Sequence, residues 1–301
     1  MKDKCYAISV IIPHYNSSIS LKRLLESIPV REEIEVVVVD DYSSSLQFEK
    51  VKSLFVNRKH AILHKNSNKK GAGVCRNIGI EYSSGGHLLF ADADDFFTKE
   101  AFDILLKMTV SNPKTDIVFF PPTSCYDEDT RVKARRHLKY KNMLEEFTYN
   151  ASKKNELKLR LTHNVPWSKL IDASLVKNNC LRFDDTIVAN DGMFSLKVGK
   201  LANSIAVSNE IIYVSTVTKN SLTTKKSYDN YKVRLEVFVR YYNFLTEEER
   251  KIIEVTPLPM LSLSRFYGLK AIYESFVFIK NNNIPIFKYF NLKNYFHLLN
   301  K

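Results

Sequence analysis

Three aspartates, Asp92, Asp94 and Asp95, directly follow a short apolar run from His87 to Ala91. Three carboxylates within four residues repel one another and resist removal from water, so a cation is needed to neutralise them. Asp92 and Asp94 point the same way at the end of the predicted strand, because side chains alternate along an extended chain. Two such oxygen ligands suit Mg²⁺ or Mn²⁺ bridging a substrate diphosphate. A second interpretation is that Asp94 and Asp95 cap a helix beginning near Thr98.

The segments that must position these acids alternate between strand and helix patterns. We expect strands over residues 6–12, 34–39, 61–63, 87–91, 116–120 and, as a short pair, 203–215. We expect helices over residues 21–28, 46–56, 74–82, 99–110 and, as one or two surface helices, 141–162. This alternation predicts an α/β fold with right-handed crossovers and a mostly parallel, doubly wound sheet.

Polar clusters follow three of the predicted strands, at residues 13–16, 40–41 and 92–95. In doubly wound sheets, ligands bind at the carboxyl ends of the strands. The three clusters are far apart in the sequence, yet all of them fall at such ends. We therefore expect them to converge on one binding cleft.

The composition indicates a folded, basic protein. Its 301 residues are 45% hydrophobic and 12% aromatic, which is enough for one large core or a main domain with an appendage. A formal net charge of +12 predicts an anionic partner, for which nucleic acid, an anionic membrane and a phosphorylated substrate all qualify. The four cysteines are widely spaced, which favours neither a zinc site nor a disulfide framework and fits a reducing cytoplasm.

The composition changes after about residue 225. Residues 1–225 carry the α/β pattern, whereas residues 226–301 are helical, aromatic and basic. No signal-peptide pattern and no apolar stretch of about 18 residues is visible, so we expect a cytoplasmic protein, soluble or peripheral on the inner membrane face. The basic aromatic helices could contact a membrane, pack on the main domain or pair with another subunit. The oligomeric state stays open.

Five segments, taken in order and spacing, resemble the motifs of family 2 glycosyltransferases with the GT-A fold. They are residues 8–16, 38–43, 73–79, 90–95 and 190–194. The resemblance extends over roughly residues 6–225. It implies an inverting transferase that uses Mn²⁺ or Mg²⁺ to move a hexose from a UDP-sugar. The implied acceptor is a growing bacterial surface glycan, such as capsule or O-antigen, on a lipid carrier at the cytoplasmic membrane.

The resemblance also implies roles for single residues. Asp191 matches the general base and Asp94 the metal ligand, while Arg76 faces the nucleotide or its diphosphate. Tyr15 packs on the uracil ring, and Asp41 hydrogen-bonds the base. The implied nucleotide-sugar set is Pro13, Tyr15, Asp40, Asp41, Asn68, Arg76, Asp92 and Ala93, and the implied acceptor-side set is Trp167, Lys169 and Asn190.

Two positions depart from the family pattern. Tyr42 stands where the family usually has glycine, so the turn must avoid a positive φ or accept strain. Asn190 stands where an acid usually precedes the base, which keeps Asp191 but removes its acidic neighbour. Each of two proposed site residues also has a purely structural interpretation. Arg76 would then form a surface ion pair, and Asp191 would be the N-cap of a helix.

Other function classes compete with the transferase hypothesis. A non-catalytic module that holds a nucleotide-sugar or glycan would keep the binding cleft without the chemistry. Nucleic-acid binding is disfavoured because no recognised module is present. A dinucleotide oxidoreductase is disfavoured because Gly71-Ala72-Gly73 lacks the third glycine of that motif and follows the third strand instead of the first.

Overall fold

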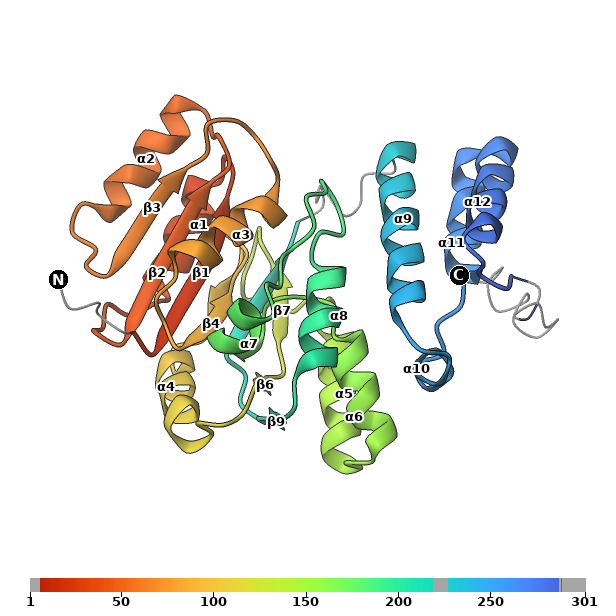
Figure 1. Ribbon diagram of the computed structural model, residues 1–301. Helices are drawn as coiled ribbons and strands as arrows, with labels where there is room; N and C mark the ends of the chain where they lie inside the picture. Colours follow the sequence, from red (N-terminus) through yellow and green to blue (C-terminus); the bar gives the residue numbers. More distant parts are fainter. Residues whose placement is uncertain (1–5, 219–226, 287, 289–301) are drawn as a thin grey trace. The chain divides into compact units, whose positions relative to one another are not determined.

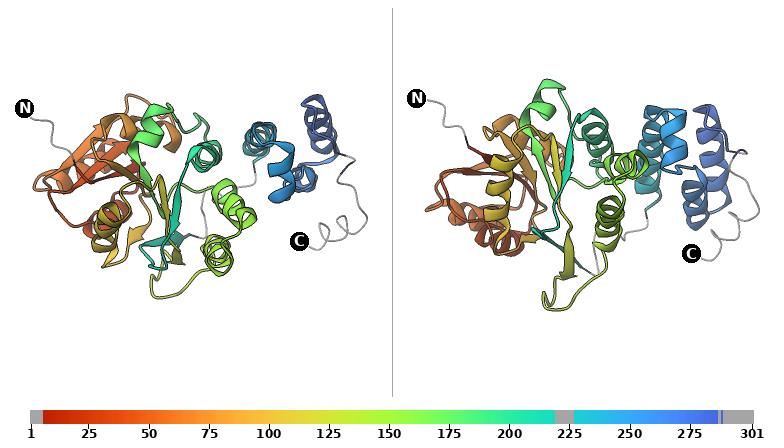
Figure 2. Two further views of the ribbon diagram at one scale, coloured as in Figure 1. Left: turned by 60° about the horizontal axis from the view of Figure 1, so that its bottom comes forward. Right: turned by 90° about the horizontal axis from the view of Figure 1, so that it is seen from below.

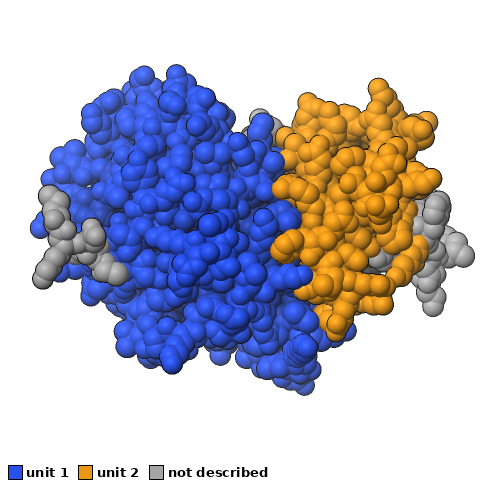
Figure 3. Space-filling view, in the orientation of Figure 1, with its two compact units in different colours: residues 1–221 blue, residues 222–301 orange. Residues whose placement is uncertain are grey.

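The computed structural model describes residues 6–218, 227–286 and 288 of the chain. Contacts divide the chain into two compact units, residues 1–221 and 222–301, which are coloured separately in Figure 3. This division and the boundary expected after residue 225 both fall within residues 219–226, outside the described part. Each unit is therefore described by itself.

The first unit alternates strands and helices along the chain, as Figure 1 shows. Its strands are β1 (Ile8–His14), β2 (Ile34–Asp40), β3 (Ala61–Lys65), β4 (His87–Phe90), β5 (Phe96–Phe97), β6 (Ile117–Phe119), β7 (Thr123–Tyr126), β8 (Lys169–Asp172), β9 (Ile205–Val207) and β10 (Tyr213–Val217). Its helices are α1 (Ser18–Glu26), α2 (Ser45–Phe55), α3 (Ala72–Tyr82), α4 (Ala101–Ser111), α5 (Leu138–Tyr149), α6 (Lys153–Thr162), α7 (Ala173–Asn178) and α8 (Gly192–Leu201). The alternation predicted up to residue 111 is confirmed, with shifts of a few residues at the element ends, except that the two-residue strand β5 was not predicted.

Seven strands form one sheet in the order β3-β2-β1-β4-β8-β6-β9. The pairs are parallel except for the two that β8 makes with β4 and β6, so the prediction of a mostly parallel sheet is confirmed. The antiparallel β8 was not expected, because a four-residue strand is too short to show a period. A second sheet has the order β5-β10-β7. There Thr216 and Val217 pair with β7, so β10 continues two residues beyond the strand pair expected over residues 203–215.

The seven-stranded sheet is covered on both faces by helices (Figure 2). Val10 and Ile12 of β1 belong to one core cluster with α1, α2 and α4. Ile11, between them, belongs to a second cluster with α3 and α5 to α8. This assignment follows from the two-residue period of a strand, which sends alternate side chains to opposite faces. A sheet apolar on both faces explains the continuous β-branched runs in the sequence.

The second unit is helical in its described part, as the sequence predicted. It contains α9 (Tyr228–Phe244), α10 (Glu247–Ile252), α11 (Leu258–Ser264), the 3₁₀ turn η1 (Arg265–Tyr267) and α12 (Leu269–Asn281). Tyr231, Leu235, Val239 and Tyr242 form one buried face of α9, which packs with Ile279 of α12. Residues 289–301, the last part of the region predicted to be helical, aromatic and basic, lie outside the described residues.

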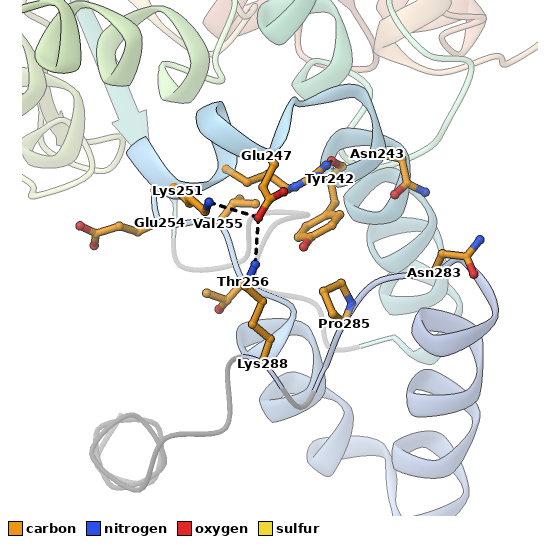
Figure 4. Close-up of a pocket in the computed structure, with 11 residues that line it drawn as sticks. Tyr242, Asn243, Glu247, Lys251, Glu254, Val255, Thr256, Asn283, Pro285 and Lys288 are labelled. Carbon is orange, nitrogen blue, oxygen red and sulfur yellow. Dashed lines mark hydrogen bonds and ion pairs between the residues drawn. The ribbon is translucent and has the colours of Figure 1, made fainter.

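A pocket of about 520 Å³ lies in the second unit between the end of α9, α10 and residues 283–288 (Figure 4). Glu247 lies between two lysines there, 3.2 Å from the ammonium of Lys251 and 3.1 Å from that of Lys288. The two lysines therefore already have an anionic partner within the chain. Among the described helices of both units, none is long and apolar enough to cross a bilayer.

Candidate active site

The sheet order brings the three predicted polar clusters to one edge. β2, β1 and β4 are parallel neighbours, with His14 of β1 opposite Asp40 of β2 and Ile11 of β1 opposite Phe90 of β4. Their carboxyl ends therefore lie side by side. Residues 13–16, 40–43 and 91–95 leave these strand ends together, although they are separated by up to 80 residues of chain.

The first two clusters are tied by a buried pair, in which Nδ1 of His14 lies 2.8 Å from a carboxylate oxygen of Asp40. The backbone N–H of Ser43 donates to the other oxygen of Asp40 at 3.0 Å. Burial by itself would raise the pKa of Asp40, but the hydrogen bonds from His14 and Ser43 outweigh it and hold this pKa below its ordinary value. Tyr42 has φ of 64°, so the turn does not avoid a positive φ. A non-glycine residue in this conformation costs of order 1–3 kcal/mol of backbone strain.

Asp41 organises the loop that precedes α3. Its carboxylate accepts the backbone N–H groups of Lys70 and Gly71 at 2.8 and 2.9 Å, and the side-chain amide of Asn66 at 3.3 Å. Gly71 has φ of 94°, a conformation that glycine adopts without strain. The carboxylates of Asp40 and Asp41 are thus bonded within the chain, and binding of the uracil base by either of them stays a prediction.

The rim of this edge carries the other expected nucleotide contacts. Tyr15 is 44% exposed, and the ammonium of Lys69 lies 3.7 Å from the centre of its ring. Asn68 is exposed beside Lys69, whereas Pro13 and Ala93 are buried. Tyr15 therefore offers an open aromatic surface next to a positive charge, which fits a base and its phosphates.

Arg76 joins the third cluster to the predicted catalytic segment. Its guanidinium donates to Asp92 at 2.6 Å and to the side-chain oxygen of Asn190 at 2.8 Å. Arg76 is 5% exposed, so it is not the surface ion pair of the alternative interpretation. A Cβ at Gly73, on the same helix, would lie 2.2 Å from the backbone oxygen of Asp184. Only glycine permits this close approach, which holds Asn190 against Arg76.

Asp92, Asp94 and Asp95 place their carboxylate oxygens within 4.8 Å of one another. Burial and the neighbouring charge of Asp92 raise the pKa of Asp94 to about 6. Asp95 is fully buried and accepts hydrogen bonds from the Tyr213 hydroxyl at 2.7 Å and the Thr216 backbone N–H at 2.6 Å. Burial and the charges of Asp94 and Asp92 hold its pKa well above the ordinary range.

The helix-cap interpretation of Asp94 and Asp95 is wrong. α4 begins at Ala101, and its N-cap is Glu100, which makes no side-chain capping bond. The two acids precede the strand β5 instead. Asp92 is bonded to Arg76 and Asp95 to β10, whereas no other residue in the described ranges donates to the Asp94 carboxylate. A hard divalent cation fits this donor set, because uncompensated carboxylate oxygens are its preferred ligands.

Asp191 stands at the N-cap position of α8 without making a side-chain capping bond. Its carboxylate therefore does not cap the helix, which argues against the interpretation of Asp191 as a purely structural N-cap. Burial raises the pKa of Asp191, the guanidinium of Arg76 opposes that rise, and the charge of Asp92 adds to it. A carboxylate with raised proton affinity beside the acidic cluster can accept a proton from a substrate hydroxyl.

The residues expected on the acceptor side lie beneath the surface. Trp167 and Lys169 are each 1% exposed, and Asn190 is 8% exposed. Trp167 stacks on Tyr213 with ring centres 5.5 Å apart, and the ammonium of Lys169 donates to the backbone oxygen of His163 at 2.6 Å. In this structure Trp167 and Lys169 offer almost no surface to an acceptor, and the assignment of their segment to the acceptor side stays a prediction.

Sequence reasoning missed Arg136, which lies between the strand expected over residues 116–120 and the helices expected over residues 141–162. Its guanidinium donates to the backbone oxygen of Thr216 at 3.2 Å and lies 6.0 Å from the Trp167 ring. Its positive charge opposes the rise in the pKa values of Asp94 and Asp95. Tyr213 and Thr216 were missed as well. No motif or spacing links any of the three to the aspartates, so nothing in the sequence could have identified them.

Residues 9–179, more than half of the chain, match the sequence profile "Glycosyl transferase family 2". Glycosyltransferase GlyA of Streptococcus pneumoniae is 29% identical over 224 residues, which are 72% of this chain and 31% of that protein. Poly(ribitol-phosphate) beta-N-acetylglucosaminyltransferase TarS of Staphylococcus aureus is 25% identical over 252 residues, 81% of this chain and 42% of TarS. The chain thus spans less than half the length of these relatives.

Solved structures share the fold. S. aureus TarS in complex with UDP-GlcNAc aligns with a TM-score of 0.67 and 22% identity, covering 89% of this chain and 79% of that one. The mannosyltransferase PcManGT of Pyrobaculum calidifontis, in complex with GDP-Man and Mn²⁺, aligns with a TM-score of 0.56 and 16% identity, covering 91% and 75%. With the matching sequence profile and a site at the carboxyl ends of its strands, this chain belongs to glycosyl transferase family 2 and has the GT-A fold.

Proposed function

We propose that this chain is an inverting, metal-dependent transferase that moves a hexose from a UDP-sugar to a bacterial surface glycan. One observation carries the proposal. Arg76 bonds both Asp92 and Asn190, and so holds the acidic cluster beside Asp191. A candidate metal ligand and a candidate base are thereby brought to one site. TarS is a beta-N-acetylglucosaminyltransferase with a structure in complex with UDP-GlcNAc, so UDP-GlcNAc is the first donor to test.

The donor side would be built from fixed charges. Asp94, with Asp92 beside it, would hold Mn²⁺ or Mg²⁺, which supplies charge stabilisation for the departing UDP diphosphate. Asp95 is not available as a ligand in the same way, because β10 holds both of its oxygens. Arg76 and Arg136 add positive charge that does not depend on pH, since a guanidinium stays protonated. Tyr15, at the rim, would receive the base.

The acceptor side would be built around Asp191. Its raised pKa makes its carboxylate a stronger base than an exposed aspartate, which helps it to take the proton of an attacking hydroxyl. The hydroxyl attacks the anomeric carbon as the bond to UDP breaks, and that carbon is inverted in a single displacement. The acceptor in this proposal is a glycan on a lipid carrier, so the protein would work at the cytoplasmic face of the membrane.

UDP release tests the proposal directly. Purified protein is incubated with a panel of UDP-sugars in the presence of Mn²⁺, Mg²⁺ or chelator, first alone and then with glycan acceptors. We expect one donor to be turned over in a metal-dependent manner, and Asp94→Asn and Asp191→Asn each to abolish turnover. Asp103→Asn is the matched control, because Asp103 is an exposed acid paired with Arg31 on another surface.

The competing binding-module hypothesis predicts a different pattern. UDP-sugar would bind in calorimetry, but no UDP would be released under any condition, including with acceptors. Full turnover by Asp94→Asn with metal present would refute the metal role. Full turnover by Asp191→Asn would refute the assignment of the base.

A further inference from the structure

α12 in the second unit has apolar side chains on both of its sides. Ala271, Ser275 and Ile279, spaced four residues apart, form its buried side. Leu269 and Tyr273, also four residues apart, lie on another side and are 85% and 70% exposed. A helix at a protein surface normally turns polar residues outward. The outward side of α12 therefore departs from the usual pattern.

The exposed apolar surface continues onto the preceding turn. η1 and α11 contact α12, and Phe266 of η1 is 52% exposed while Leu263 of α11 is 41% exposed. We define the outer face of α12 as Phe266, Leu269 and Tyr273. Scattered exposed apolar residues are ordinary, but Leu269 and Tyr273 lie one helical turn apart on the same side of α12, and Phe266 precedes them with the guanidinium of Arg265 5.3 Å from its ring centre. Such a grouping of exposed apolar side chains indicates a binding surface.

Cations accompany this outer face. The side chain of Lys270 is 88% exposed, and Lys280 is exposed near the end of the same helix. Glu274, the one acid of α12, is bonded to the hydroxyl of Tyr228 on α9 and lies 3.8 Å from Lys270. Glu274 therefore offsets part of the charge of Lys270, because a hydrogen bond from a neutral hydroxyl does not remove the charge of its carboxylate. The sequence of residues 222–301 has 13 Lys and Arg against 7 Asp and Glu, so this unit is basic as a whole.

We propose that the outer face of α12 docks on an anionic lipid surface. Phe266, Leu269 and Tyr273 enter the boundary between headgroups and acyl chains, and Lys270 and Lys280 lie against the headgroups. Aromatic side chains favour this boundary because they are apolar with a polar or polarisable edge. The binding itself is independent of catalysis. Its purpose, bringing the enzyme to a lipid-linked acceptor, rests on the proposed function.

Charge favours a lipid surface over a second copy of the chain. A symmetric dimer through this face would place the Lys270 and Lys280 side chains of two copies near one another, and like charges across an interface are unfavourable. Anionic headgroups supply the opposite charge instead. The lipid surface is therefore the occupant that fits both the apolar and the basic parts of the face.

Vesicle flotation of the full chain tests the proposal. The probes are phosphatidylcholine vesicles and vesicles in which phosphatidylglycerol replaces part of the phosphatidylcholine. We expect binding to the anionic vesicles only, lost with added salt. Lys270→Gln with Lys280→Gln should weaken binding by about fivefold for each lysine, and Leu269→Ser with Tyr273→Ser by more than about tenfold. Leu46→Ser changes a leucine on α2 that is 68% exposed, and this variant should bind as wild type does.

Two results of the vesicle assay would overturn the proposal. One is the absence of binding to anionic vesicles by a chain whose circular dichroism shows that it is folded. The other is equal vesicle binding by wild type and the Leu269→Ser, Tyr273→Ser variant. Light scattering accompanies the experiment, and a dimer that this double variant dissociates would assign the face to a second copy. UDP release without vesicles is measured in parallel, so failure of the membrane proposal is separate from failure of the proposed chemistry.

Discussion

Asp94 should weaken the metal-free fold at neutral pH while being required for activity. Its pKa of about 6 lies above the ordinary value of 3.8, because the carboxylate is partly buried beside Asp92. Between these two values the folded chain binds more protons than the unfolded chain, so the free energy of unfolding falls as pH rises. The penalty is absent below about pH 4 and complete above about pH 6. The difference between the two pKa values corresponds to about 3 kcal/mol.

Asp94→Asn removes the titrating group and keeps the shape of the side chain. We expect the variant in chelator to match the wild type near pH 4 and to exceed its free energy of unfolding by up to about 3 kcal/mol above pH 6. Mn²⁺ should stabilise the wild type more than the variant, because a ligand that binds only the folded state raises stability. UDP release should be lost in the same variant.

Denaturant unfolding at a series of pH values measures the prediction. Each pH compares wild type, Asp94→Asn and the exposed control Asp103→Asn in chelator, then in Mn²⁺. Because groups outside the acidic cluster titrate equally in all three proteins, the difference between wild type and variant reports Asp94 together with Asp95, whose pKa depends on the charge of Asp94. A difference that stays constant from about pH 4 to pH 7 would show that Asp94 is not under repulsion. The account of the acidic cluster would then be refuted.

Three further substitutions test the supports of the site. Gly73→Ala should destabilise the fold by about 1–3 kcal/mol in denaturant unfolding and reduce UDP release, because its Cβ would lie 2.2 Å from a backbone oxygen. Gly86→Ala is the control, because the nearest atom to its Cβ would be 3.8 Å away, and it should have neither effect. Arg76→Lys keeps the charge but loses the two-pronged bonding, so kcat for UDP release should fall about a hundredfold, and wild-type kcat would contradict this role. Lys169→Met removes a cation that lowers the pKa of Asp191, the proposed base, so the acidic limb of the kcat/KM profile should move to higher pH. An unmoved limb with unchanged folding would exclude that influence.

The strands and helices up to residue 111 could be predicted because the information for them is local. β-branched runs, caps and short polar turns determine these elements within a few residues of their ends. β8 was not predicted because four residues are too few to show the two-residue period of a strand. Its place in the sheet depends on pairing with β4 and β6. The end of β10 was missed for the same kind of reason, since Thr216 and Val217 become strand by pairing with β7.

For the candidate site, too, the features set by local sequence could be predicted and the contacts between distant residues could not. The carboxylates that follow strands were identified from residue type and position along the chain, and Arg76, on the helix after β3, was identified from the family resemblance. Their partners were not. The bond between Arg76 and Asn190 joins residues 114 positions apart, and the bond between Asp95 and Tyr213 joins residues 118 positions apart.

The sequence by itself determined the alternating fold, the placement of acids at strand ends and the family to which the chain belongs. All three depend on short patterns in which each residue is read against its close neighbours. Only the tertiary structure decided that Trp167 and Lys169 are buried, that Arg136 faces the aspartates, and which side of α12 is exposed. The physical reason is that burial and electrostatic environment are set by residues brought together from distant parts of the chain.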